Sequence, residues 1–203
     1  MTPRSEAEAV VVFTAPSGAG KSTLARAVMD RLPSLRFSVS VTTRRPRDGE
    51  VDGVHYHFVD HERFDEMIRG GELMEYEEVY PGLFYGTPWS EVERSSVDEP
   101  VLLDIDVKGA KRVKDSYKWQ CFAVFVAPPS VEKLEQRLVE RNSESAESLA
   151  ERIKRWPIEM AYRSYFDSVV VNNDLDRATE EAFTEVEAYL KKRRAWTPRL
   201  PLD

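Results

Sequence analysis

Apolar residues in this chain gather in short, nearly unbroken runs that are separated by amphipathic stretches. Four runs have the length and apolar character of strands buried on both faces, at residues 9–13, 101–106, 121–127 and 168–172. Helical spacing of apolar positions occurs in stretches between or after these runs, which begin near Ser22, Ser130, Arg152 and Thr179. Strands that alternate with helices predict an α/β fold with a mostly parallel central sheet flanked by helices.

Two stretches interrupt this alternation. Alternating apolar positions predict strands at residues 37–41 and 54–59, a helix follows from His61 to Arg69, a further strand covers 73–80, and 84–88 is predicted as a turn before a short helix. We expect a core of residues 9–39, 97–129 and 161–194, an insert at 40–96, a helical insert at 130–160, and flexible tails at 1–8 and 195–203.

Composition narrows the class of protein. Of the 203 residues, 41% are hydrophobic and 32% are charged, and the net charge is −7. An acidic chain of this kind is a poor candidate for general nucleic-acid binding. The chain shows no apolar run of membrane-spanning or signal-peptide length, and its single cysteine, Cys121, excludes an internal disulfide. These features predict a cytoplasmic protein with no membrane partner.

A glycine-rich segment joins the first strand to the first helix. It consists of Ala15, Pro16, Ser17, Gly18, Ala19, Gly20, Lys21, Ser22 and Thr23. Strand, glycine-rich loop and helix form the context of a phosphate-binding loop, in which backbone N–H groups, the helix dipole and Lys21 all face phosphate oxygens. Ser22 can offer a hydroxyl to a magnesium ion. Ala15 stands where the usual pattern has its first glycine, and alanine is tolerated there if the backbone needs no positive φ.

Arginines cluster in both inserts although the chain is acidic. Arg44, Arg45 and Arg47 surround a proline in the first insert, and the second insert carries Arg137, Arg141 and Arg152. Arginine suits bidentate contacts to phosphate. Asp104 and Asp106 end a predicted core strand, at the edge where open α/β sheets bind ligands. A phosphate loop with two arginine-bearing inserts favours a phosphoryl transfer enzyme that binds two nucleotides.

Several segments together resemble the guanylate kinase family. They are Ser40 to Arg47, Gly49 to Phe58, Glu75, Tyr85 to Thr87, Leu103 to Gly109, Ala127 to Ser130, Arg137 to Arg141, Arg152, and Val171 to Asp174. The resemblance covers about residues 10–192. It implies a P-loop nucleoside monophosphate kinase fold, with an acceptor-nucleotide insert and a helical lid insert, and Mg-dependent transfer of the γ-phosphoryl group of ATP to GMP, and also to dGMP.

The resemblance also implies roles for individual residues. The phosphate loop, Arg137 and Asn172 would bind ATP, while Ser22 and Asp104 would hold Mg²⁺. GMP would contact Ser40, Arg44, Arg47, Tyr56, Glu75, Tyr85, Thr87 and Asp106, of which Ser40, Glu75 and Thr87 would recognise guanine. Catalysis would rest on Lys21, Arg47, Asp104, Arg141 and Arg152.

Two alternatives remain open from the sequence. A guanylate-kinase-like domain that binds partner proteins without catalysis would be expected to lack Lys21 or the lid arginines, which are present here. A related kinase could act on another phosphorylated acceptor, although Ser40, Glu75 and Thr87 together resemble a guanine reader. The sequence does not indicate an oligomeric state.

Overall fold

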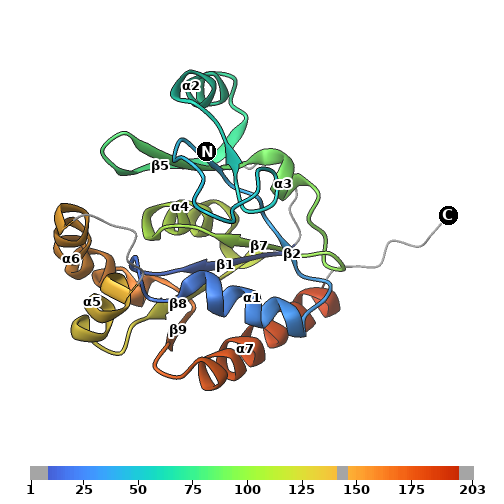
Figure 1. Cartoon of the computed structure of the whole chain (residues 1–203). Helices are drawn as coiled ribbons and strands as arrows, with labels where there is room; N and C mark the ends of the chain where they lie inside the picture. Colours follow the sequence, from blue (N-terminus) through green and yellow to red (C-terminus); the bar gives the residue numbers. More distant parts are fainter. Residues whose placement is uncertain (1–8, 141–145, 197–203) are drawn as a thin grey trace.

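The computed structural model describes residues 9–140 and 146–196, and its centre is a five-stranded parallel sheet in the order β2-β7-β1-β8-β9 (Figure 1). The strands are β1 (Val10–Thr14), β2 (Arg36–Phe37), β7 (Val101–Asp104), β8 (Cys121–Ala127) and β9 (Ser168–Val171). Neighbouring strands β1 and β7 pair in a register that sets Phe13 beside Asp104. The predicted α/β class with a mostly parallel core sheet is confirmed.

Helices cover both faces of this sheet because β1 is apolar on both sides. Val11 and Phe13 belong to the core beneath α1 (Lys21–Arg31) and α7 (Leu175–Trp196), whereas Val10 and Val12 belong to the core beneath α4 (Val107–Tyr117). Such two-sided burial explains the continuous apolar run in the sequence. In the part of the chain that the structure describes, no helix is both long and apolar enough to cross a membrane.

A second, four-stranded sheet lies above the core in Figure 1, in the order β4-β3-β6-β5. It consists of β3 (Val41–Thr42), β4 (His57–Phe58), β5 (Leu73–Tyr80) and β6 (Leu83–Pro88), with α2 (His61–Arg69) packed on it and α3 (Trp89–Glu93) after it. The helix at His61–Arg69 and the strand at Leu73–Tyr80 have the predicted bounds.

Three sequence expectations in this region were wrong. The predicted turn at 84–88 belongs to strand β6, which pairs with β5 in a hairpin whose turn lies between Tyr80 and Leu83. The predicted strand at 37–41 is divided between β2 and β3, which belong to different sheets, and the strand expected at 54–59 is only the two residues of β4. The chain crosses from one sheet to the other near Ser38, and a local alternation pattern cannot detect such a crossing.

Two helices that contact each other lie beside the phosphate loop. They are α5 (Val131–Glu140) and α6 (Ala146–Ala161), and Pro157 lies inside α6. Arg141 lies outside the described residues, as do the predicted tail at 1–8 and most of the tail at 195–203. The C-terminal tail was predicted to begin at residue 195, which is two residues too early because helix α7 continues through Trp196.

Candidate active site

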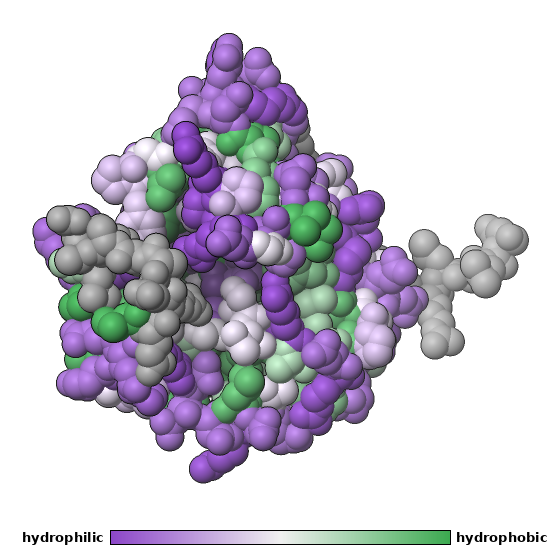
Figure 2. Space-filling model, in the orientation of Figure 1, coloured by the Kyte–Doolittle hydropathy of each residue, from purple (hydrophilic) through white to green (hydrophobic). Residues whose placement is uncertain are grey.

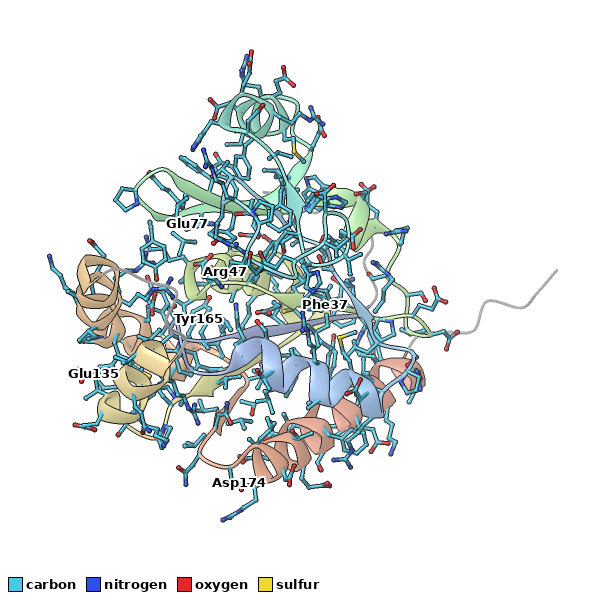
Figure 3. All side chains as sticks on the ribbon, viewed as in Figure 1. Phe37, Arg47, Glu77, Glu135, Tyr165 and Asp174 are labelled. Carbon is cyan, nitrogen blue, oxygen red and sulfur yellow. The ribbon has the colours of Figure 1, made fainter. Side chains whose placement is uncertain are left out.

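A cleft of roughly 1030 Å³, open to solvent, lies between the phosphate loop and the four-stranded sheet. Figure 2 shows a hollow near the centre of this face, bordered mostly by hydrophilic side chains. The predicted residues that line the cleft come from four parts of the chain: residues 15–22 of the loop, then Ser40, Arg47, Tyr56, Glu75 and Tyr85 of the insert, Asp104 and Asp106 after β7, and Arg152 of α6. Figure 3 shows Arg47 between the two sheets.

The phosphate loop has the backbone that its glycines were expected to allow. Gly18 and Gly20 have φ values of 90° and 88°. A Cβ added at Gly20 would also lie only 2.4 Å from the side-chain nitrogen of Asn172, so a larger residue is excluded twice. Ala15 is buried and is not among the described residues with positive φ. The methyl group of Ala15 therefore imposes no backbone strain on the loop.

Lys21, Ser22 and Asp104 form a compact charged cluster where β1 and β7 end. The Lys21 ammonium lies 2.6 Å from Oδ1 of Asp104 and donates to the Ile105 carbonyl at 2.8 Å. The Ser22 hydroxyl donates to Oδ2 of the same carboxylate. This cluster places one cation and two hard oxygen donors at the mouth of the loop, as phosphoryl transfer requires.

A magnesium ion fits this donor set. Mg²⁺ is usually held by one or two protein oxygens, with phosphates and waters completing its octahedral shell. Ser22 Oγ and the Asp104 carboxylate are oxygens of that kind, beside the loop that would hold the phosphates. Among residues 9–140 and 146–196 no group of three or more His, Cys, Asp or Glu side chains forms a separate metal site.

Arg137 and Asn172 lie on the far side of the phosphate loop from the cleft. Both donate to the Ala19 carbonyl, at 3.2 Å and 2.9 Å respectively, and Arg137 also donates to the Asn172 carbonyl at 2.8 Å. Together with Thr23 they line a second cavity of about 910 Å³. These residues, which are predicted to contact ATP, thus adjoin the loop at a cavity separate from the cleft.

The arginine-rich loop is organised by Glu50. The carboxylate of Glu50 accepts two hydrogen bonds of 2.9 Å from Arg44 and one of 2.7 Å from the Arg47 N–H. Partial burial opposes ionisation, but the bonds from Arg44 and the Arg47 N–H outweigh it, so the pKa of Glu50 is lowered. Glu50 lies in the segment from Gly49 to Phe58 that resembles the family, but residue type and spacing alone did not indicate a role for it.

Two tyrosines complete the predicted acceptor-phosphate group. The Tyr56 and Tyr85 rings meet edge to face at 6.0 Å, and the Arg44 guanidinium lies 5.5 Å from the Tyr56 ring. Burial, followed by the charge of Asp104, raises the pKa of Tyr56 beyond its usual range. Its hydroxyl therefore keeps its proton and can donate a hydrogen bond to a phosphate.

Glu75 is a buried acid of the cleft, and only 6% of it is exposed. Its Oε1 accepts a 2.7 Å hydrogen bond from Thr87 across the β5–β6 pair. Burial, and then the negative charge of Asp106, raise the pKa of Glu75 to about 7. Glu75 therefore differs from its neighbours Glu72 and Glu78, which are exposed.

The cleft also contains residues that the sequence analysis missed. The Tyr80 ring lies 5.0 Å from the guanidinium groups of both Arg152 and Arg155, so the end of β5 touches α6. Arg152 in turn donates to the Ser17 hydroxyl, and the buried Glu159 lines the same cleft. The spacing of the arginines predicted a helix but gave no information about its partner across the cleft.

The fold and the cleft define a class of protein, an α/β kinase whose phosphate-binding loop lies between a second sheet and a pair of helices. Residues 7–192 match the family model described as "Guanylate kinase". A curated guanylate kinase from Salinibacter ruber is 52% identical over 181 residues, which cover 89% of this chain and 96% of the relative. One from Chlorobium luteolum is 44% identical over 186 residues, 91% and 94% of the two chains.

Solved structures agree with the sequence relatives. A crystal structure of guanylate kinase from Anaplasma phagocytophilum has a TM-score of 0.73 to this chain at 30% identity, and the match covers 96% of both chains. A gluconokinase from Sinorhizobium meliloti, at 16% identity and a TM-score of 0.53, shares the fold alone. The chain belongs to the guanylate kinase family, which confirms the resemblance seen in the sequence.

Proposed function

We infer that the chain is a guanylate kinase enzyme that transfers the γ-phosphoryl group of ATP to GMP and gives ADP and GDP. The observation that carries this inference is that the Lys21–Asp104 pair and the buried Glu75 line the same cleft. A protein-interaction domain without catalysis has no need of that arrangement, and this alternative is not favoured.

We propose that Glu75, Thr87 and Ser40 recognise guanine. A carboxylate presents two acceptor oxygens in one plane. Guanine presents two adjacent donors, its N1–H and its 2-amino group, whereas adenine has an unprotonated N1 and no 2-amino group. Adenine would leave the buried carboxylate of Glu75 unpaired, and sites built for hydrogen bonding reject such analogues strongly. Because dGMP carries the same base, we expect it to be accepted too.

The remaining residues would position the two phosphate groups. Arg44, Arg47, Tyr56 and Tyr85 would bind the phosphate of GMP. The loop N–H groups and Lys21 would bind the outer phosphates of ATP, with Arg137 and Asn172 near its nucleoside and Asp106 near the acceptor. Phosphoryl transfer depends mainly on such positioning and on charge neutralisation.

Lys21, Arg152 and Arg141 would stabilise the charge that develops on the transferred group, and Asp104 would hold Lys21 in place. Mg²⁺, with Ser22 and Asp104 as protein ligands, would neutralise charge on the β- and γ-phosphates. In this scheme residues 40–96 are the acceptor insert and 130–160 the lid. The reaction would serve purine nucleotide metabolism in the cytoplasm.

The test is a coupled assay of ADP formation with purified protein, ATP and Mg²⁺. GMP, dGMP, AMP, CMP and UMP are compared at equal concentration. We expect turnover with GMP and dGMP and little with the other three. Absence of GMP-dependent ADP release would defeat the proposed activity, and preference for another monophosphate would support the related-kinase alternative instead.

A further inference from the structure

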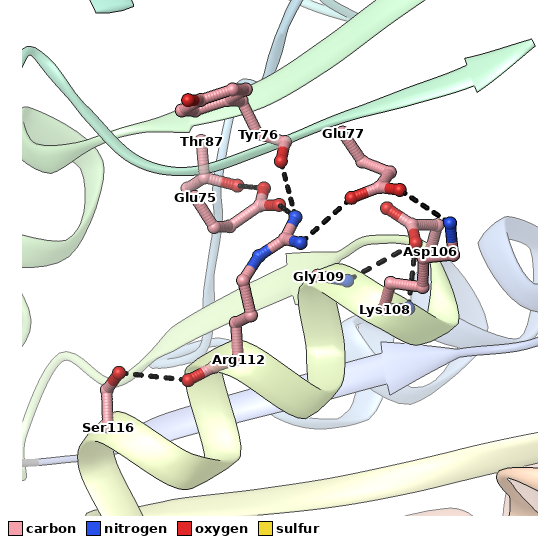
Figure 4. A network of polar contacts seen from close by, with 9 residues as sticks. All are labelled: Glu75, Tyr76, Glu77, Thr87, Asp106, Lys108, Gly109, Arg112 and Ser116. Carbon is pink, nitrogen blue, oxygen red and sulfur yellow. Dashed lines mark hydrogen bonds and ion pairs between the residues drawn. The ribbon is translucent and has the colours of Figure 1, made fainter. Parts of the chain in front are cut away.

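Arg112 of helix α4 connects the core of the protein to strand β5 (Figure 4). Its guanidinium donates to Oε2 of Glu77 at 2.8 Å and to the Tyr76 carbonyl, and it lies 3.7 Å from Oε2 of Glu75. Lys108, one turn earlier on α4, binds the other oxygen of Glu77 at 2.8 Å. Two anchors therefore fix the Arg112 side chain at a place where it faces Glu75.

The two oxygens of Glu75 have different surroundings. Oε1 accepts the Thr87 hydroxyl, while Oε2 faces the first turn of α4. A Cβ at Gly109 would lie 2.5 Å from Oε2, so the helix backbone leaves no space for the carboxylate to turn in that direction. Arg112 approaches the same oxygen at ion-pair distance without forming a close hydrogen bond. Among the described residues Oε2 therefore has a cation beside it but accepts no close hydrogen bond.

The charges around Glu75 oppose one another. From its own strand it faces the negative Glu77, from the start of α4 the negative Asp106, and from the next turn of α4 the positive Arg112, with the neutral Thr87 on β6. Burial and Asp106 raise the pKa of Glu75 to about 7, whereas Arg112 acts in the opposite direction. An opposite charge at such a distance typically lowers a carboxyl pKa by about 1–3 units.

We propose that Arg112 is a positioning residue for guanine recognition, which favours the ionised form of the Glu75 carboxylate and fixes its orientation while Glu77 and the Tyr76 carbonyl hold Arg112 in place. This inference rests on the role proposed for Glu75 above. Arg112 is not among the residues that line the cleft, so it would act through Glu75. The competing explanation is that Arg112 merely attaches α4 to β5.

The first experiment measures the charge effect without activity. ¹³C NMR of the side-chain carboxyls in the ligand-free protein follows the titration of Glu75, whose signal is assigned with Glu75→Gln. Arg112→Met keeps the aliphatic stem and removes the charge, and it should raise the pKa of Glu75 by roughly 1–3 units. Arg112→Lys keeps a cation and should restore most of the wild-type value. Arg63→Met is the matched control, because Arg63 is also ion-paired and is 47% exposed compared with 45% for Arg112.

The second experiment measures KM for GMP from pH 6 to pH 9. In Arg112→Met the pH above which KM for GMP falls should move upward with the pKa of Glu75. At pH 7, KM for GMP should rise at least roughly fivefold, following the smaller ionised fraction. KM for ATP should not change. Arg63→Met should retain the wild-type profile.

The outcomes separate the two proposals. An unchanged pKa of Glu75 in Arg112→Met would overturn the inference about Arg112 and leave the proposed function intact. A higher pKa with an unchanged KM profile for GMP would show that Glu75 does not recognise guanine, which removes the basis of both. A KM that rises equally at every pH, or a Lys variant no better than Met, would indicate simple attachment of α4 and would also overturn the inference.

Discussion

At the scale of single residues, the structure gives Lys21 and Glu75 surroundings that the sequence did not contain. The loop pattern predicted Lys21, but its salt bridge with Asp104 depends on the pairing of β1 with β7. The acids from Glu72 to Glu78 look alike in the sequence, and only the fold shows that Glu75 is buried while Glu77 pairs with Lys108 and Arg112. Burial and long-range pairing are tertiary properties. Residue type and spacing could therefore mark these side chains as candidates but could not predict which of them is buried or paired.

Lys21→Ala should lower kcat at least roughly 10²–10³-fold, because the loop loses a cation that faces the transferred charge. The sequence alone suggested an unaffected fold, but the substitution also removes the cation paired with the nearly buried Asp104. We therefore expect a loss of about 1–3 kcal/mol in the free energy of unfolding. Steady-state kinetics and urea unfolding measure the two effects. Lys111→Ala, which removes an exposed pair with Asp115, should change neither.

GMP affinity should rise with pH through neutrality. Because the pKa of Glu75 is about 7 in the free protein, only part of the population carries the carboxylate that guanine needs. Raising the pH ionises the rest, so the apparent Kd for GMP should fall roughly tenfold between pH 6 and pH 8. Calorimetric titration with GMP at several pH values measures this.

Glu75→Gln should remove that pH dependence and weaken GMP binding by about 1–3 kcal/mol, because one acceptor becomes a donor. From the sequence, Glu77→Gln was the natural control. Because Glu77 forms ion pairs with Lys108 and Arg112, Glu78→Gln is the better control. Glu78 is exposed and accepts the Gly82 N–H, a bond that glutamine can also accept. A wild-type GMP-to-AMP preference in Glu75→Gln would reject Glu75 as the guanine reader.

At the scale of elements, local patterns located most strands of the core sheet and, beside the second sheet, β5 and α2, but they missed β6 and did not give the bounds of β3 and β4. The turn residues Gly86 and Pro88 concealed strand β6, whose partner is β5. Helix α4 was not predicted, although Asp106 caps it and Val107, Ala110, Val113 and Tyr117 are spaced along its buried face. A search for a capped helix after the acidic strand end would have found α4, and with it Arg112.

Gly109→Ala separates the stability of α4 from its role in the site. Alanine favours a helix interior by about 1 kcal/mol over glycine, so helix propensity alone predicts a more stable protein. The new Cβ would lie 2.5 Å from Oε2 of Glu75 and must displace that carboxylate. We expect KM for GMP to rise at least roughly tenfold while KM for ATP and the fold persist. Ser116→Ala, later on the same helix, is the control, and an unchanged KM for GMP in Gly109→Ala would contradict the crowding argument.

At the scale of the whole molecule, the end of strand β5 and helix α6 touch across the cleft. Tyr80 contacts Arg152 and Arg155, and Arg152 contacts Ser17 of the loop. We expect bound ATP and GMP to rearrange these contacts as the inserts close around them. A bisubstrate analogue should therefore change the fluorescence of Trp156 in α6 and compact the protein in small-angle scattering. Trp156→Phe should abolish the fluorescence change, and identical scattering with and without the analogue would count against closure.

The pairing of Phe13 with Asp104 has a consequence for the evolution and engineering of this protein. The phosphate loop and its acid extend from adjacent strands of one hydrogen-bonded ladder, so their separation is set by sheet geometry and not by either insert. The Lys21–Asp104 pair is therefore held in place by the core sheet, and the two inserts would add the nucleotide contacts and the further arginines around it. An acceptor insert with another base preference could be grafted between residues 39 and 97 without rebuilding that centre, so acceptor choice and phosphoryl transfer can change independently in such a scaffold.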